Sequence, residues 1–186
     1  AAVTGSVGKT STKEALRFVL GQQGATHASE ASYNNLWGVP LTLARMPAET
    51  KFGIFEIGMN HAGEIRPLVA QVKPDVAVVT TIEAVHLAHF DHVEAIADAK
   101  AEIFEGLAPG GVAVVNADNP HAARLAAAAT RAGARVWTFG EKGGEAQLVS
   151  VALGEASSDI EAVIFGQHLG FTYGAPGRHF AQNALG

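Results

Sequence analysis

The sequence contains no cysteine, and this absence excludes both a disulfide-stabilised scaffold and a zinc site built on thiolates. Long apolar runs are missing as well, since none approaches the roughly 20 residues that a membrane-spanning helix needs. Positive charge is scarce, with 13 Lys and Arg against 18 Asp and Glu and a net charge of −5. This balance argues against a nucleic-acid-binding protein that works through bulk charge, whereas local phosphate binding by backbone amides stays open.

What the sequence does have is the composition of a globular domain. Its 186 residues are 48% apolar and 17% charged, which excludes a disordered chain and suits one domain with a sizeable core. No signal peptide is recognisable and cysteine is absent, so we expect a cytoplasmic protein. The chain opens without methionine and stops just after a helix has started, so we expect an excised domain of a longer protein. Separately, we expect the protein to be a monomer.

Strand-like and helix-like segments alternate over residues 1–140. Short apolar segments of the kind found in buried strands are Ala1–Thr4, Phe52–Gly58, Val76–Thr81, Val112–Asn116 and Val136–Phe139. Segments with helical spacing of apolar residues lie between them, at Thr10–Leu20, Glu64–Val72, His92–Gly106 and Pro120–Ala132. This alternation predicts an α/β fold with a mostly parallel sheet flanked by helices.

The pattern changes after residue 140. Three short strands are predicted, Gln147–Leu153, Ile160–Phe165 and His168–Tyr173, and the turn between the last two is typical of a hairpin. Residues 141–176 are therefore expected to form a small antiparallel sheet on the C-terminal flank of the core, and a helix is expected to start near His179.

The strongest motif follows the first predicted strand and opens the first predicted helix. It is a Gly-x-x-Gly-Lys-Thr loop, two residues shorter than the usual phosphate-binding loop, so the fold is expected to be P-loop NTPase-like. Glycines let the backbone amides converge, and the helix N-terminus adds positive partial charge. The residues expected to bind the nucleotide here are Gly5, Ser6, Val7, Gly8, Lys9, Thr10 and Ser11.

Two acid–base residues follow later strands. Glu56 ends an apolar strand, and the carboxyl ends of parallel strands form the ligand crevice, so Glu56 is a candidate metal ligand. His86 follows the next strand and could complete a metal shell. His86, His89 and His92 are spaced by three, but oxygen ligands suited to Mg²⁺ lie close by and disfavour zinc. For Lys100, the residue pattern alone favours a solvated helix lysine paired with a neighbouring acid.

These residues resemble the ATP-dependent Mur ligases, the amide-forming enzymes of bacterial peptidoglycan synthesis. The resemblance spans residues 1–186 and covers the central ATPase domain, so an N-terminal domain for the uridine nucleotide and a C-terminal domain are expected outside this sequence. Within the family it is strongest for enzymes that add D-alanyl-D-alanine to UDP-N-acetylmuramoyl-tripeptide. It is carried by Thr4–Glu14, by Asn34–Leu43, by Glu56–Asn60 with Gly63–Ile65, and by the stretch from His86 to Phe104.

The resemblance implies a role for each polar residue near the loop. Lys9 and Thr10 would hold the triphosphate of ATP and a first Mg²⁺, and Glu56 and His86 would bind Mg²⁺ near the γ-phosphate. Lys100 matches a lysine that is carbamylated in this family, and the carbamate would hold a second Mg²⁺. Lys9, Lys100 and His86 are accordingly the expected catalytic residues.

The resemblance also implies contacts with the substrates. Asn34 and Asn35 match a stretch near the reacting substrate, and Asn183 matches an asparagine that contacts adenine. Thr81 departs from the family pattern, since relatives commonly have Asn there, which leaves the polar contact at that strand end open. The implied reaction forms an acyl phosphate from ATP and a carboxylate, and the 186-residue fragment alone is not expected to turn over.

Two alternative functions stay open at this point. Another Mur-type ligase or a folylpolyglutamate synthase would share the loop and the lysine but should lack the Asn34–Leu43 signature. A non-ligase P-loop switch would normally have the longer loop and a strand ending in Asp, where this chain has Glu56. The diamino acid at the third position of the peptide is not predicted by this sequence.

Overall fold

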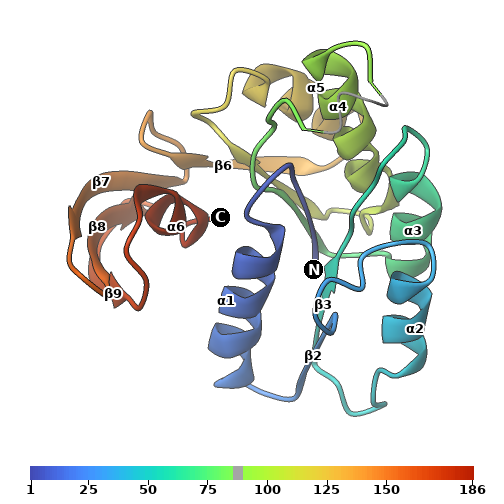
Figure 1. Ribbon diagram of the computed structural model, residues 1–186, viewed down its shortest axis with the longest axis horizontal. Coiled ribbons are helices and arrows are strands. Elements are labelled where there is room, and N and C mark those ends of the chain that lie inside the picture. Colours follow the sequence, from blue (N-terminus) through green and yellow to red (C-terminus); the bar gives the residue numbers. More distant parts are fainter. Residues whose placement is uncertain (86–89) are drawn as a thin grey trace.

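A computed structural model describes residues 1–85 and 90–186 of the chain. Within these residues the framework is a nine-stranded sheet in the order β2-β3-β1-β4-β5-β6-β7-β8-β9 (Figure 1). The strands are β1 (Ala2–Thr4), β2 (Thr26–Ala28), β3 (Phe52–Glu56), β4 (Val76–Val79), β5 (Val112–Asn116), β6 (Arg135–Gly140), β7 (Ala146–Leu153), β8 (Ser158–Ile164) and β9 (Gln167–Tyr173).

Strand β1 lies between β3 and β4, and both of these pairs are parallel. The chain therefore leaves β1 toward β2 and β3 on one side and later returns to add β4 on the other. Val3 pairs with Glu56, and Thr4 pairs with Val79. Three strands consequently end at the same edge of the sheet, which is where ligands bind in folds of this kind. The predicted α/β fold is confirmed.

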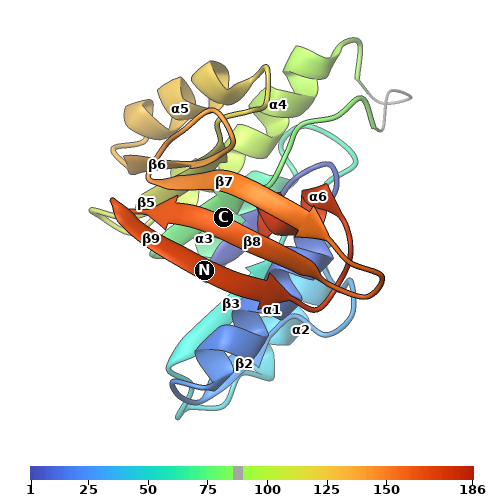
Figure 2. The ribbon, with the colours of Figure 1, turned by 90° about the vertical axis from the view of Figure 1, so that its left-hand side faces the viewer.

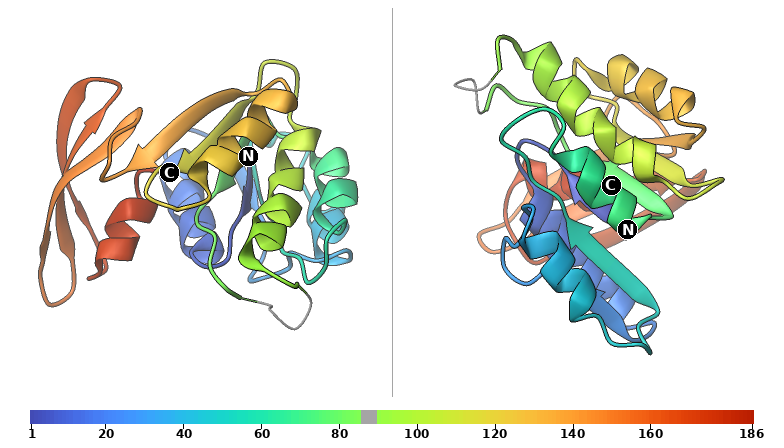
Figure 3. Two further views of the ribbon diagram at one scale, coloured as in Figure 1. Left: turned by 90° about the horizontal axis from the view of Figure 1, so that it is seen from above. Right: turned by 90° about the vertical axis from the view of Figure 1, so that its right-hand side faces the viewer.

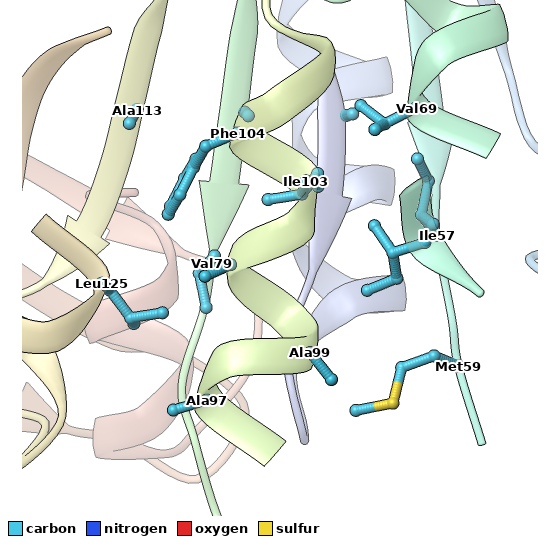
Figure 4. Packing of buried hydrophobic residues seen from close by; sticks show 14 of the residues in the cluster. Ile57, Met59, Val69, Val79, Ala97, Ala99, Ile103, Phe104, Ala113 and Leu125 are labelled. Carbon is cyan, nitrogen blue, oxygen red and sulfur yellow. The ribbon is translucent and has the colours of Figure 1, made fainter. Parts of the chain in front are cut away.

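Helices cover both faces of the parallel part (Figure 1). Consecutive strand residues point to opposite faces, so Val3 packs with Leu16 and Leu20 of α1, whereas Ala2 belongs to the larger cluster on the other face. Figure 4 shows that cluster, in which Val79 and Ile103 are buried. The helices are α1 (Lys9–Gly21), α2 (Gly38–Ala44), α3 (Ile65–Val72), α4 (Val93–Ala101), the 3-10 helix η1 (Glu102–Gly106), α5 (Ala122–Arg131) and α6 (Arg178–Asn183).

Helices α4 and α5 lie side by side on one face of the sheet (Figure 3). None of the helices in the two described ranges combines the length and the apolar character needed to cross a bilayer.

Several elements differ from the sequence-based expectation. The short elements β2 and α2 were not predicted, because three and seven residues carry too little periodicity to stand out. The single helix expected over His92–Gly106 is α4 followed by the tighter η1. In α1, the apolar side chain of Val19 is 54% exposed, whereas Thr12 and Lys13 are buried.

Strands β7, β8 and β9 form the expected antiparallel arrangement (Figure 2). Phe165 and Gly166, both with positive φ, form the two-residue turn that the right-handed twist of a hairpin favours. These strands are not a separate sheet, because β7 pairs in parallel with β6 through Phe139 and Ala146. Helix α6 packs on this part of the sheet through Ala181.

Candidate nucleotide and metal site

The loop between β1 and α1 has a backbone that only glycine adopts without strain at two positions. Gly8 has φ of +86° and caps α1, which begins at Lys9. Gly5 has φ of +150°, and a Cβ there would collide with Oγ1 of Thr80. The hydroxyl of Ser11 donates to the carbonyl of Gly8 at 3.0 Å. The loop thus points the N-terminus of α1, with its positive partial charge, toward the edge of the sheet.

The segment after β4 holds this loop in place. The Ser6 hydroxyl donates to the carbonyl of Glu83 at 3.1 Å and accepts from the backbone amide of Glu83 at 2.9 Å. The Thr80 hydroxyl donates to the carbonyl of Val7 at 2.6 Å. Loop and strand end are therefore fixed to each other before any ligand binds, which lowers the ordering cost of binding.

Glu56 lies at the centre of a hydrogen-bonded set beside the loop. Its Oε2 accepts from Thr10 Oγ1 at 2.9 Å, and its Oε1 accepts from Asn34 Nδ2 at 2.7 Å. The side chain is nearly inaccessible, with 1% exposure. A carboxylate and a hydroxyl held this close together are oxygen ligands of the type that Mg²⁺ prefers. The residues present therefore fit a Mg²⁺ ion at this edge.

Lys9 and Lys100 line one cleft of about 450 Å³ beside this set, together with Asn34 and Asn35. The Nζ of Lys9 donates to the carbonyl of Gly5 at 2.9 Å, and burial lowers the pKa of Lys9, which the charge of Glu56 partly offsets. Lys9, at the start of α1 in this cleft, makes the cleft suited to a polyanionic ligand such as a triphosphate.

Lys100 is buried, with only 1% exposure, so the expectation of a solvated lysine from the residue pattern alone was wrong. Burial, and secondarily the positive charge of Lys9, lowers the pKa of Lys100 to about 7. In the part of the chain that the structure describes, no side chain or carbonyl forms a hydrogen bond or ion pair with this amine. Near neutral pH a large share of such an amine is uncharged and nucleophilic.

Asn34 and Asn35, which follow β2, form hydrogen bonds with different partners. Asn34 contacts Glu56, whereas the side-chain oxygen of Asn35 accepts from the amides of Trp37 and Gly38 and so caps α2. Asn60 and Glu64 also line this cleft and were not predicted as site residues. Their membership in the Glu56–Ile65 stretch was the signal that could have found them.

Asn183, at the end of α6, lies next to the phosphate-binding loop although 175 residues separate it from Gly8. A Cβ on Gly8 would lie 2.5 Å from Asn183 Nδ2. Helix α6 is anchored by Arg178, whose guanidinium donates twice to the carboxylate of Glu141 at 2.7 Å. The structure therefore brings the expected adenine-contacting residue to the loop.

The remaining predicted site residues have mixed positions. His86 and His89 lie outside the described residues, and the exposed His92 caps α4 by accepting from the amide of Ala95 at 3.1 Å. Residues 1–85 and 90–186 hold no group of three His, Cys, Asp or Glu side chains that could bind a metal ion. The hydroxyl of Thr81 accepts from Asn119 Nδ2 at 3.0 Å, so the strand end has a polar partner without an asparagine at that position.

The family follows from a comparison of the whole chain with known proteins. Residues 3–186 match the family model described as the Mur ligase middle domain. The chain belongs to this family. The resemblance stated from the sequence motifs is thereby confirmed.

Similar proteins narrow this to one branch of the family. The chain is 47% identical over 118 residues to the UDP-N-acetylmuramoyl-tripeptide–D-alanyl-D-alanine ligase of Rickettsia prowazekii, a match covering 63% of this chain and 26% of that protein. A crystal structure of MurF from Acinetobacter baumannii matches 99% of this chain and 40% of that one, at 31% identity and a TM-score of 0.94. MurF from Thermotoga maritima, solved in complex with ADP, matches 99% of this chain and 43% of that one, at 26% identity and a TM-score of 0.86. The matched segment thus spans about a quarter of the length of the curated Rickettsia prowazekii relative.

Proposed function

We propose that this Mur ligase middle domain binds ATP and Mg²⁺ and drives the joining of D-alanyl-D-alanine to UDP-N-acetylmuramoyl-tripeptide. One observation carries the proposal: Thr10, Glu56 and Asn34 form a hydrogen-bonded set beside a phosphate-binding loop, in reach of the cleft lined by Lys9 and Lys100. The ADP complex of the Thermotoga maritima relative supports the choice of nucleotide. The names of the relatives support the choice of substrates.

Each residue near the loop has a role in holding the triphosphate. The backbone amides of residues 5–8 and the start of α1 bind phosphate oxygens, and Lys9 neutralises charge on the β- and γ-phosphates. Thr10 and Glu56 hold Mg²⁺, with His86 as a further ligand. Mg²⁺ supplies neutralisation of the negative charge that develops during phosphoryl transfer. Asn183 contacts the adenine.

Lys100 becomes a metal ligand after carbamylation. Its uncharged Nζ attacks the carbon of carbon dioxide, an N–C bond forms, and one proton is lost from nitrogen to solvent. The product is a carbamate anion, which holds a second Mg²⁺. The lowered pKa of Lys100 supports this step, because a protonated amine has no lone pair to donate.

The reaction joins two substrates in two displacements. A carboxylate oxygen of the tripeptide attacks the γ-phosphorus of ATP and ADP leaves, which forms an acyl phosphate. The amine of D-alanyl-D-alanine then attacks the acyl carbon, phosphate leaves, and the amine loses a proton. Asn34 and Asn35 face the reacting groups from the cleft wall. The chain's contribution is positioning in line and neutralisation of charge.

The remaining parts of the enzyme lie in the longer protein. An N-terminal domain holds the uridine nucleotide, a C-terminal domain closes over ATP and the amine, and the protein acts in the cytoplasm as a monomer. The 186-residue chain alone binds nucleotide weakly and does not form product. Isothermal titration and a product assay on this chain check both statements, and tight ATP binding together with amide formation would contradict them.

A product assay on the full-length protein tests the reaction. ATP, Mg²⁺ and UDP-N-acetylmuramoyl-tripeptide are supplied with D-alanyl-D-alanine or with single amino acids, and we expect amide product with the dipeptide. Glu56→Gln should lower kcat by at least about 100-fold, as removal of an outer or inner metal contact does, while the exposed Glu155→Gln serves as control. Product formed only with single amino acids would favour another Mur-type ligase or a folylpolyglutamate synthase. Phosphate release without any acceptor would favour a P-loop switch.

A further inference from the structure

Lys13 is a fully buried lysine for which the proposed chemistry has no use. It lies one turn after Lys9 in α1, and its side chain has 0% exposure. Its Nζ donates to the carbonyls of Ser29 and Ala31, both at 2.8 Å, and forms an ion pair with Glu14 at 2.8 Å. A buried ammonium group is costly unless it is fully partnered, so the fold retains Lys13 for the contacts it makes.

Those contacts hold the start of the segment 29–35, which leads to Asn34. The Ser29 hydroxyl accepts from the backbone amide of Glu56 at 3.0 Å, and the Asn34 carbonyl accepts from the amide of Gly58 at 2.7 Å. The segment is therefore tied to the end of β3 through Ser29, to the residues after β3 through Asn34, and to α1 through Lys13. It ends with the Asn34 side chain on Oε1 of Glu56.

Ala31 gives the segment a strained point. Its φ is +47°, a left-handed conformation that is unfavourable for a residue with a Cβ. The carbonyl of Ala31 is one of the two that Lys13 binds. A charge-assisted hydrogen bond at this carbonyl is strong enough to offset the backbone cost and keep the turn in this conformation.

We propose that Lys13 is a positioning residue that sets the Asn34–Glu56 contact and thereby the orientation of the Glu56 carboxylate toward Mg²⁺. Lys9 and Thr10 in the first turn of α1 then bind phosphate and contact the carboxylate, and Lys13 one turn later holds the segment 29–35. This inference rests on the proposed function only in naming Mg²⁺ as the ion, since the contact between Asn34 and Glu56 is independent of it.

The test compares Lys13→Met with Glu14→Gln in the full-length protein. Glu14→Gln removes the ion pair and keeps both carbonyl contacts, so it controls for lost charge pairing. We expect Lys13→Met to raise the Mg²⁺ concentration at half-saturation of ADP binding by about tenfold, with little change in Mg²⁺-free ADP binding. We also expect faster amide hydrogen exchange confined to residues 32–35. Glu14→Gln should show neither effect.

A second substitution separates positioning from general stability. Ala31→Gly removes the left-handed penalty, so in the Lys13→Met background it should recover part of the Mg²⁺ affinity. Unchanged Mg²⁺ dependence and unchanged exchange in folded Lys13→Met would overturn the proposal. If Lys13→Met gives no cooperative thermal transition, the milder Lys13→Gln is measured in its place against the same expectations. If the unmodified full-length protein shows no Mg²⁺-dependent ADP binding, the proposed function fails, and hydrogen exchange alone decides the role of Lys13.

Discussion

The hydroxyl of Thr10 donates to the carboxylate of Glu56 at 2.9 Å, although 46 positions separate the two residues in sequence. One residue lies in the first turn of α1 and the other ends β3, so the contact exists only because β1 and β3 are adjacent in the sheet. The contact joins the phosphate-binding loop to the metal-binding carboxylate of the proposed site. The proposed binding of nucleotide and Mg²⁺ depends on this relationship.

Replacing Thr10 with valine tests this relationship directly. Thr10→Val keeps the shape of the side chain and removes the hydroxyl. Because the residue is exposed and its hydrogen bond is single, the free energy of unfolding should fall by only about 1 kcal/mol. The Mg²⁺-dependent part of ADP affinity should fall about tenfold. Isothermal titration with and without Mg²⁺ measures the difference. Thr130→Val, which removes an exposed helix hydroxyl bonded to Ala126, is the matched control and should leave binding unchanged.

Gly8→Ala tests the conformation of the loop. The new Cβ would carry a left-handed penalty and would also meet Asn183 Nδ2 at 2.5 Å. Gly133→Ala has a similar φ of +79° with no atom within 4 Å, so it isolates the penalty itself, which is roughly 1–2 kcal/mol. Both variants should lose stability in urea unfolding, Gly8→Ala at least as much as Gly133→Ala, but only Gly8→Ala should lose ADP binding. Full ADP affinity in Gly8→Ala would contradict the loop geometry.

Carbamylation of Lys100 should depend on pH in a defined direction. The neutral amine is the reactive form, and its fraction rises as the pH passes the lowered pKa of about 7. At constant dissolved ¹³C-labelled carbon dioxide, the carbamate signal in a carbon NMR spectrum should increase from about pH 6 to about pH 8. Lys100→Met should abolish the signal, whereas exposed Lys51→Met should not. A signal that persists in Lys100→Met would place the carbamate elsewhere.

The same lowered pKa predicts that, in the absence of carbon dioxide, the stability of the fold also rises with pH. Between about 7 and the ordinary value of 10.5, the unfolded chain binds more protons at Lys100 than the folded chain does. Stability therefore rises with pH across that window, and the cost of burying the charged amine is complete below pH 7. Lys100→Met should be more stable than the unmodified chain at about pH 6, on the order of a few kcal/mol, and the difference should shrink toward about pH 10. Urea unfolding in degassed buffer measures this, and a difference independent of pH would refute it.

Most of the core could be predicted because its signals are local. Alternating apolar segments predicted most strands and helices of residues 1–140, and the turn at Phe165 and Gly166 predicted the hairpin of β8 and β9. The elements that were missed, β2 and α2, are too short for periodicity to reveal, and they form where tertiary contacts supply what the local sequence lacks. The β6–β7 pairing was missed for the same reason, since two backbone pairs leave no pattern in the sequence.

The sequence by itself determined the loop, because two glycines followed by Lys9 and Thr10 act through backbone conformation and a helix N-terminus. It also determined which residue types could bind a metal. Only the tertiary structure decided that Lys13 and Lys100 are buried, since the local residue pattern around each is that of an ordinary helix lysine. The burial of a side chain depends on which parts of the chain pack around it. The Lys13 amine donates to two backbone carbonyls, whereas the Lys100 amine lies beside a cleft and near the charge of Lys9.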